Sequence, residues 1–124
     1  MSYIYVATPY SKYPHGTEEA YRMACRVTAL LLKAGLPVFS PIAHSHGIAQ
    51  IGGIDPVDHD FWVDADKAML ETAGALLVVQ AEGWEQSRGM AHEIDVFTKA
   101  GKPIFVMESE EPWAIPPELF FWPS

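Results

Sequence analysis

Short apolar runs alternate along the chain with segments whose apolar residues recur every three or four positions. The runs, rich in β-branched and aromatic residues, predict strands at 3–7, 37–40, 75–80 and 103–107. The periodic segments predict helices from Thr17 to Gly35, from about Asp60 to Thr72 and from Ser87 to Gly101, the first capped by Thr17. We expect residues 42–59, with three histidines and three glycines, to form a long loop with one helical turn near Ile48.

Strands that alternate with helices of this length predict an α/β fold. We expect residues 1–124 to form a single three-layer domain of the flavodoxin or Rossmann type, with a parallel sheet of four or five strands and helices on both faces. A tail rich in Pro and Trp begins at about residue 108. Ligands of such sheets collect beyond the carboxyl ends of the strands, where the sequence places Thr8 to Ser11, the loop after Ser40, and residues 81–93.

Composition narrows the classes of partner. A formal net charge of −8 argues against a nucleic-acid polymer, which needs a basic face, but leaves room for a small anion. The single cysteine, Cys25, suits a reducing cytoplasm, and no apolar run approaches the ~20 residues that span a bilayer. Four large aromatic residues of the tail should pack on the domain or on a neighbour, so we expect a homo-oligomer, a dimer or a tetramer: Trp113, Phe120, Phe121 and Trp122.

The segment 83–93, GWEQSRGMAHE, carries the clearest chemistry. Ser87 is suited to cap the helix that follows it, and Gly89 allows a ligand to approach the backbone closely. Such a helix start attracts anions, and Arg88 either pairs with a phosphate there or points to solvent. Glu93 follows Ser87 by six residues, at most ~9 Å of helical rise, so an acid would lie within one small ligand's length of the anion.

The histidines and aromatic residues near the other loops allow several interpretations. His44 and His46, with His59 and Asp60, lack the spacing of known zinc sites, so we predict no metal. We expect His46 to line a sugar or base pocket instead. The aromatic side chains of Tyr10, Trp62 and Trp84 are suited either to stacking on a base or to packing in the core.

Three motifs in this order resemble the nucleoside 2-deoxyribosyltransferase-like superfamily. They are IYVATPYS at 4–11, the acid Asp66 before the third strand, and S-x-G-x-x-x-E at 87–93. More closely, IYVATPYS, VFSPIAHSHGIA and GWEQSRGMAHEI are similar to a short bacterial branch of that group whose function is not known. The superfamily cleaves the N-glycosidic bond of nucleosides or nucleoside 5′-monophosphates, through a glutamate that attacks the anomeric carbon of the sugar.

The resemblance implies a role for each matching residue. Glu93 would be the nucleophile, Tyr5 the tyrosine that supports it, and Asp66 the acid that contacts the base or assists its departure. Without the motif, Glu93 and Asp66 would be interpreted as solvated acids near helix starts, and Tyr5 as a core residue. Transferases carry an aspartate where this chain has Ser87, whereas monophosphate hydrolases carry a serine that binds phosphate. Pro9 replaces a serine of the hydrolases, which leaves Thr8 and Ser11 for phosphate.

The resulting expectation is a cytoplasmic N-glycosidase that hydrolyses the base–sugar bond of a nucleoside 5′-monophosphate or related nucleotide, without a metal or organic cofactor. A carboxylate suits this reaction because the transition state is oxocarbenium-like. Two alternatives stay open. One is 2-deoxyribosyl transfer between bases, and the other is a non-catalytic module that binds or senses a nucleotide.

Overall fold

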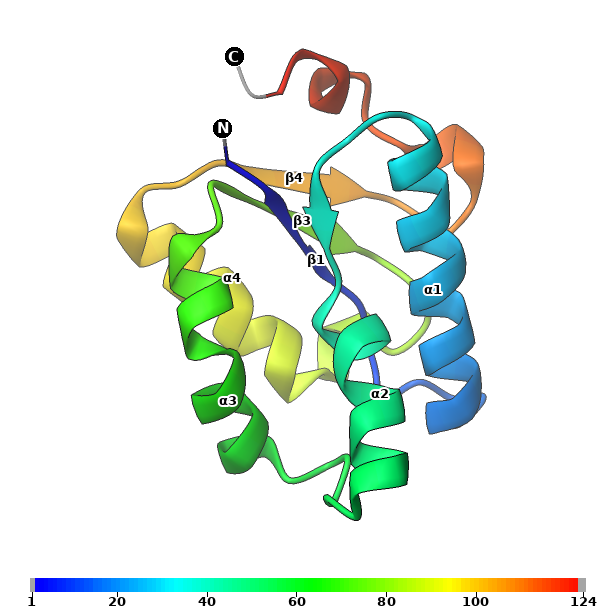
Figure 1. Ribbon diagram of the computed structural model, residues 1–124. Coiled ribbons are helices and arrows are strands. Elements are labelled where there is room, and N and C mark those ends of the chain that lie inside the picture. Colours follow the sequence, from blue (N-terminus) through cyan, green and yellow to red (C-terminus); the bar gives the residue numbers. More distant parts are fainter. Residues whose placement is uncertain (1, 123–124) are drawn as a thin grey trace.

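The computed structural model describes residues 2–122, which form one parallel sheet with helices on both faces (Figure 1). The strands run in the order β2-β1-β3-β4 and all pairs are parallel. Their bounds are β1 Ile4–Ala7, β2 Val38–Phe39, β3 Ala75–Val79 and β4 Ile104–Met107. The predicted α/β class and parallel sheet are confirmed, with four strands.

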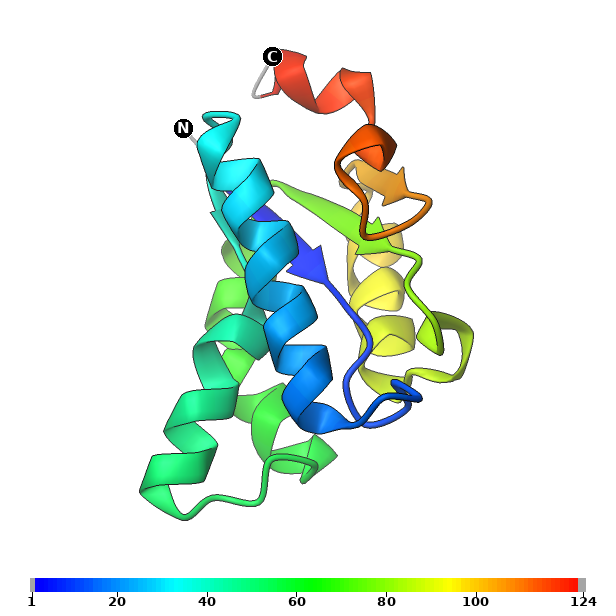
Figure 2. The ribbon, with the colours of Figure 1, turned by 90° about the vertical axis from the view of Figure 1, so that its right-hand side faces the viewer.

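Alternation along β1 divides the core into two halves. Ile4 and Val6 point to one face, where they pack with Met23, Val27 and Leu31 of α1, Thr17–Lys33. Tyr5 and Ala7 point to the other face, towards α3, His59–Thr72, and α4, Arg88–Ala100. Figures 1 and 2 show α1 on one side of the sheet and α3 and α4 on the other. Each large apolar side chain buried in this way stabilises the fold by about 1.5–3 kcal/mol.

The predicted loop at 42–59 is wrong over most of its length, because Pro41–Gly52 form a helix, α2. Ser40 begins it by accepting a hydrogen bond from the Ala43 amide at 3.1 Å, and Pro41 suits the first helical position. Gly53 ends it in the left-handed conformation, with φ of 71°. The helix packs against α1 through His46 and Ala49, and this tertiary contact outweighs the low helical propensity of its glycines.

A smaller correction concerns the start of α1. Thr17 is the first helical residue, not the cap, and the cap position is held by Gly16 with φ of 92° and no side-chain hydrogen bond. A threonine could not adopt that backbone conformation without strain. The other predicted helices begin where expected, with α3 capped by Asp58 and α4 by Ser87.

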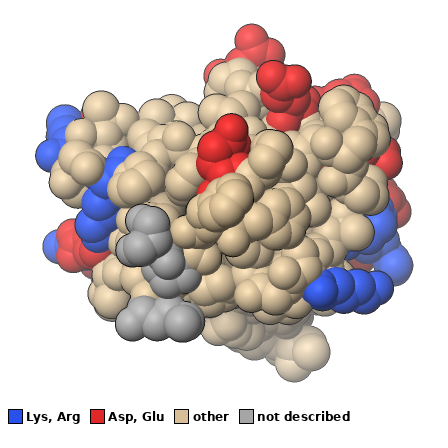
Figure 3. All heavy atoms as spheres, turned by 90° about the horizontal axis from the view of Figure 1, so that it is seen from above, with Lys and Arg blue, Asp and Glu red and all other residues tan. Residues whose placement is uncertain are grey.

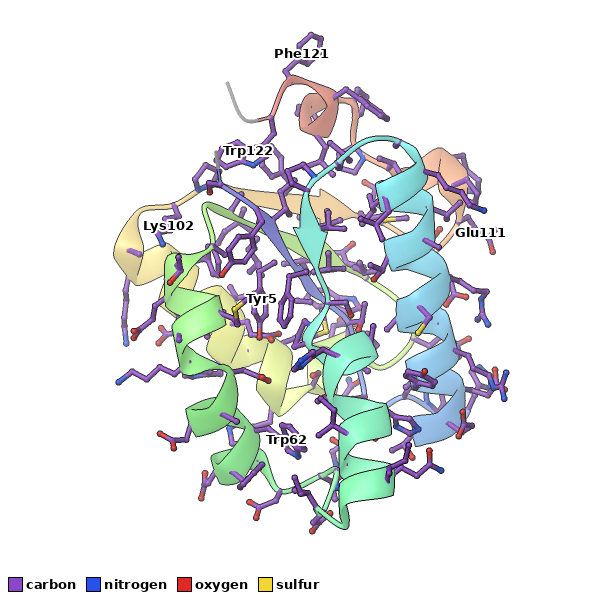
Figure 4. All side chains as sticks on the ribbon, viewed as in Figure 1. Tyr5, Trp62, Lys102, Glu111, Phe121 and Trp122 are labelled. Atoms are coloured by element: carbon purple, nitrogen blue, oxygen red, sulfur yellow. The ribbon has the colours of Figure 1, made fainter. Side chains whose placement is uncertain are left out.

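The tail folds back over the face of the sheet that α1 covers. Two short 3₁₀ helices, Pro112–Ala114 and Pro117–Phe121, bring the buried Leu119 and the partly buried Trp122 against the core. Trp113, Phe120 and Phe121 remain exposed, by 74%, 55% and 78%. Phe121 points away from the domain in Figure 4, and the face around the tail carries few charged side chains in Figure 3. The tail therefore packs on its own domain through only part of its aromatic surface.

Within residues 2–122, no helix combines the length and the apolar character that crossing a membrane requires.

Candidate active site

A cleft of about 370 Å³ opens beyond the carboxyl ends of β1 and β3. The chain runs from β1 to β2 on one side, whereas β3 and β4 lie on the other side, so this is the point at which the direction of strand addition reverses. Such a point leaves a crevice between the connecting loops. The walls are the loop after β1, the first turns of α2 and α4, one face of α3, and the segment that joins α2 to α3.

Tyr5, Asp66 and Glu93, which come from β1, α3 and α4, all line this cleft. The Tyr5 ring is fixed between Phe39 and Phe97, with centroid distances of 5.7 Å and 6.4 Å, and its hydroxyl hydrogen bonds with the Glu93 carboxyl group. Figure 4 shows Tyr5 at the centre of the fold. The three residues that the resemblance singled out therefore converge on one cavity, although they are far apart in the sequence.

Burial dominates the electrostatics of this group. It raises the pKa of Glu93 to about 8, with the Asp66 charge acting in the same direction and the Tyr5 hydrogen bond opposing both. Burial also raises the pKa of Asp66, and His44 partly offsets the effect. The pKa of Tyr5 lies far above its usual range, because of burial and then the nearby Glu93. At neutral pH the empty cleft thus holds Tyr5 as a phenol and Glu93 mostly as a neutral acid.

The start of α4 forms a second part of the cleft. The Ser87 hydroxyl accepts a hydrogen bond from the Met90 amide at 3.2 Å, which confirms its predicted role as a cap. Gly89 lines the cleft, and a side chain placed on it would meet only the Ser87 hydroxyl, at 4.0 Å. Amides at a helix start favour anions, and the missing side chain leaves them accessible. Arg88 is exposed and lies 4.0 Å from Asp60, a weak surface pair.

Thr8 contributes a buried hydroxyl group to the lining of the cleft. Its side chain lines the cleft and only 4% of the residue is exposed, yet its hydroxyl finds no hydrogen-bond partner within residues 2–122. An unpaired buried hydroxyl costs about 1–3 kcal/mol, so a ligand atom that bonded to it would recover this energy. Ser11 also lines the cleft, from the exposed part of the same loop.

Tyr10 lines the cleft, whereas His46 lies behind Tyr10 and is not part of the lining. The Tyr10 hydroxyl and His46 Nδ1 share a hydrogen bond of 2.7 Å, and the His46 ring stacks on Tyr21 at 4.4 Å. His46 Nε2 lies 3.5 Å from Glu18 Oε1. The structure therefore brings Tyr10 to the cavity with the other predicted residues, and places His46 among the side chains that hold Tyr10 from behind.

The sequence analysis did not assign several side chains that line the cleft. His59, Trp62, Asp66 and Leu70 form one stripe along α3, because residues three and four apart share a helical face. His92 precedes Glu93 and lies one turn after Arg88, and Lys12 follows Ser11. The stripe that contains Asp66 was readable from the sequence and could have identified His59. It also places Trp62, one of the aromatic residues considered for stacking on a base, in the lining of the cleft. Trp84 packs against the core and is not part of the lining.

No cluster of three histidine, cysteine or acidic residues within residues 2–122 is arranged to hold a metal ion.

Comparison with curated proteins gave no match for the chain. A family profile described as a domain of unknown function, DUF1937, matches residues 2–109, which include all four strands and every residue that lines the cleft. This chain therefore belongs to the DUF1937 family.

Proposed function

We propose that the protein is an N-glycosidase that hydrolyses the base–sugar bond of a nucleoside 5′-monophosphate or a related nucleotide. The observation that carries the proposal is the convergence of Glu93, Tyr5 and Asp66 in one cleft with the start of α4. Gly89 and Glu93 are four residues apart on one face of that helix, about 6 Å of rise. A nucleotide separates its 5′-phosphate from its anomeric carbon on that scale. The motifs that resemble the nucleoside 2-deoxyribosyltransferase-like superfamily support the same assignment.

In the proposed reaction, ionised Glu93 attacks the anomeric carbon as the carbon–nitrogen bond breaks and the base leaves with the bonding electrons. Asp66 gives the departing base a proton, a role that its raised pKa favours because the carboxyl retains its proton to higher pH. Water then cleaves the glycosyl ester on Glu93, and Asp66 accepts a proton from that water. The Tyr5 hydroxyl stabilises the carboxylate form of Glu93 before attack and after release.

The phosphate of the substrate is proposed to bind at the start of α4, between its free amides and the Thr8 hydroxyl. Ser87, Arg88 and Gly89 would contribute from the helix, and Ser11 from the loop after β1. Tyr10, held by His46, would form part of the wall beside the sugar or base. No metal or organic cofactor enters this scheme. The expected setting is the cytoplasm, with the chain as a homo-oligomer.

One specific observation favours a second candidate function. A pKa of about 8 leaves Glu93 mostly protonated at neutral pH, and a neutral carboxyl donates a hydrogen bond instead of attacking a sugar. A module that binds or senses a nucleotide without turnover would have such a group. Deoxyribosyl transfer, the third candidate, differs only in the acceptor of the sugar, and Ser87 argues against it because transferases carry an aspartate at that place.

The test is incubation of the protein with ribo- and deoxyribonucleosides and their 5′-monophosphates, with free base followed by chromatography. We expect release from monophosphates, loss of release in Glu93→Ala and Glu93→Gln, and weaker binding of monophosphates alone in Ser87→Ala. Release that survives Glu93→Ala would rule out the mechanism. Binding without release would favour the sensing module, and release that requires a second base would favour the transferase.

A further inference from the structure

His59 and His92 meet at the wall of the cleft beside the start of α4. His59 is the first residue of α3, and its ring centroid lies 6.3 Å from that of His92, with the two rings nearly perpendicular. Both rings line the cleft, as does Arg88. Three side chains that can carry positive charge are thus grouped next to the helix amides of Ser87 to Gly89, although the chain as a whole is acidic.

This grouping has the chemistry of a site for a dianion. The amides at the start of α4 favour negative charge, and the Thr8 hydroxyl supplies an independent sign of a ligand because it is buried in the same cleft without a partner among residues 2–122. Arg88 can turn from Asp60 to a ligand at little cost, since their 4.0 Å contact is exposed on both sides. Unlike Arg88, His59 can change its charge near neutral pH.

We propose that His59 is a specificity-determining residue of this anion subsite, which takes up a proton when a dianionic phosphate binds and so selects phosphomonoesters over nucleosides and phosphodiesters. The identity of the ligand rests on the proposed function, whereas the coupling of a dianion to a proton on His59 does not require catalysis. A phosphodiester carries one negative charge and a nucleoside none, so each favours protonation of His59 less strongly than a dianionic phosphomonoester does.

The charged side chains around His59 and His92 determine whether binding of an anion adds a proton to His59. Burial lowers the pKa of His59, Arg88 and His92 lower it further, and Asp60 opposes them. A neighbouring groove between α3 and α4, which Asp60 and His92 also line, adds three more charged side chains: Asp64, Lys67 and Glu71. Inside the cleft, Asp66 and Glu93 lie further along the same two helices. These groups together hold the pKa of His59 below its usual range, and an adjacent dianion favours its charged form.

Sulfate is the most direct probe, because it stays dianionic over the whole working range and any proton taken up belongs to the protein. The five histidines can be followed by the NMR signals of their ring protons from pH 5 to 8.5. Titrations in sodium sulfate and in sodium chloride of equal ionic strength separate binding from screening. The Glu93→Gln variant serves as background, because it removes a cleft acid whose pKa of about 8 lies in this range and prevents turnover of substrates.

We expect sulfate to raise the midpoint of the His59 titration by about one unit or more. Sulfate affinity should then fall by roughly tenfold in total as pH rises from the midpoint of the free state to that of the bound state, because a shift of one unit corresponds to a tenfold change in affinity. Ribose 5-phosphate should act like sulfate, and ribose should have no effect. His59→Gln should remove the pH dependence of sulfate binding, whereas the matched His15→Gln should retain it.

Several results would overturn the inference. They are the absence of sulfate binding, a His59 curve that sulfate leaves unchanged, and pH-dependent binding that persists in a folded His59→Gln variant. Failure of the proposed function looks different, because monophosphates would then release no base while the His59 titration still responded to sulfate. Base release with an unresponsive His59 would retain the function and reject this inference.

Discussion

The hydroxyl of Tyr5, on the inner strand β1, meets the carboxyl group of Glu93 on α4, and its hydrogen bond lowers the pKa of that acid. Burial and the Asp66 charge both act in the opposite direction. Tyr5 therefore sets how much of Glu93 is ionised at a given pH. Its own ionisation is suppressed, so it remains a donor throughout the physiological range.

Tyr5→Phe should consequently raise the pKa of Glu93 and lower base release at neutral pH, roughly tenfold for each unit of the rise. The pH–rate profile of the wild type should climb through about pH 8, as Glu93 loses its proton, and that of the variant should climb at higher pH. Tyr3→Phe is a matched control, since the Tyr3 hydroxyl donates to the Met69 carbonyl outside the cleft. A profile unchanged by Tyr5→Phe would contradict this role.

Glu93 should also make stability depend on pH. Its pKa rises from 4.5 to about 8 on folding, so the folded state binds more protons between these values. The stabilising contribution of the protonated acid is fully present below pH 4.5 and is lost as pH rises through about 8. Urea denaturation should therefore show Glu93→Gln close to the wild type at pH 4 and more stable, by up to a few kcal/mol, at pH 8.5. Equal stability of the two proteins at pH 8.5 would show that the carboxyl is not desolvated.

Gly74 marks the place where the tail closes on the sheet. A Cβ atom there would lie 1.8 Å from the Ser2 hydroxyl and 2.8 Å from Cζ2 of Trp122. Gly74→Ala should therefore displace the tail and destabilise the fold by about 1–3 kcal/mol in urea denaturation. Gly47→Ala is the control: it lies within α2 with nothing within 4 Å of the added atom, and should stabilise by about 0.5–1 kcal/mol. Equal effects of the two substitutions would mean that Trp122 does not pack as described.

The aromatic residues that stay exposed in the tail are expected to mediate self-association. Trp113, Phe120 and Phe121 are large apolar side chains that stay mostly exposed within one short segment, and clustered apolar surface is typical of an interface. Sedimentation velocity should show a dimer or tetramer that dissociates on dilution, and Phe121→Ser should shift the equilibrium towards the monomer. Ile51→Ser is the matched control, because Ile51 is 90% exposed at the far end of α2. A wild-type monomer at every concentration would refute the expectation.

The sequence predicted the sheet well because its strands are continuous apolar runs, as buried parallel strands require. It failed at α2, because the three histidines and three glycines of residues 42–59 suggested a loop. The residues that begin and end the helix were nevertheless visible in the sequence: Ser40 before Pro41 at its start and Gly53 at its end. The buried side of α2 is made by Pro41, His46 and Ala49, so no stripe of large apolar residues announces a helix.

The candidate site was predictable only in part, for a similar reason. Ser87 and Gly89 could be interpreted from local helix physics, and Glu93 from its spacing to them. The pKa of Glu93 depends on Tyr5 and Asp66, which only the fold brings near. The Thr8 hydroxyl is unpaired within residues 2–122 because of the residues that the fold packs around it, so no sequence pattern could predict this.

Gly83 allows the loop after β3 to approach the loop after β1 closely. It adopts φ of +85°, and the Lys12 carbonyl oxygen passes 2.3 Å from the position that a Cβ atom would occupy. The loops after β1 and β3 are therefore seated against each other, and a ligand that bound between them would find its anion contacts already in place. On the opposite side of the cleft, Trp62 donates one hydrogen bond of 2.9 Å to the Asp55 carbonyl in the segment joining α2 to α3. We therefore expect substitutions in that segment to alter the shape of the cleft more readily than substitutions in the two loops that Gly83 holds together.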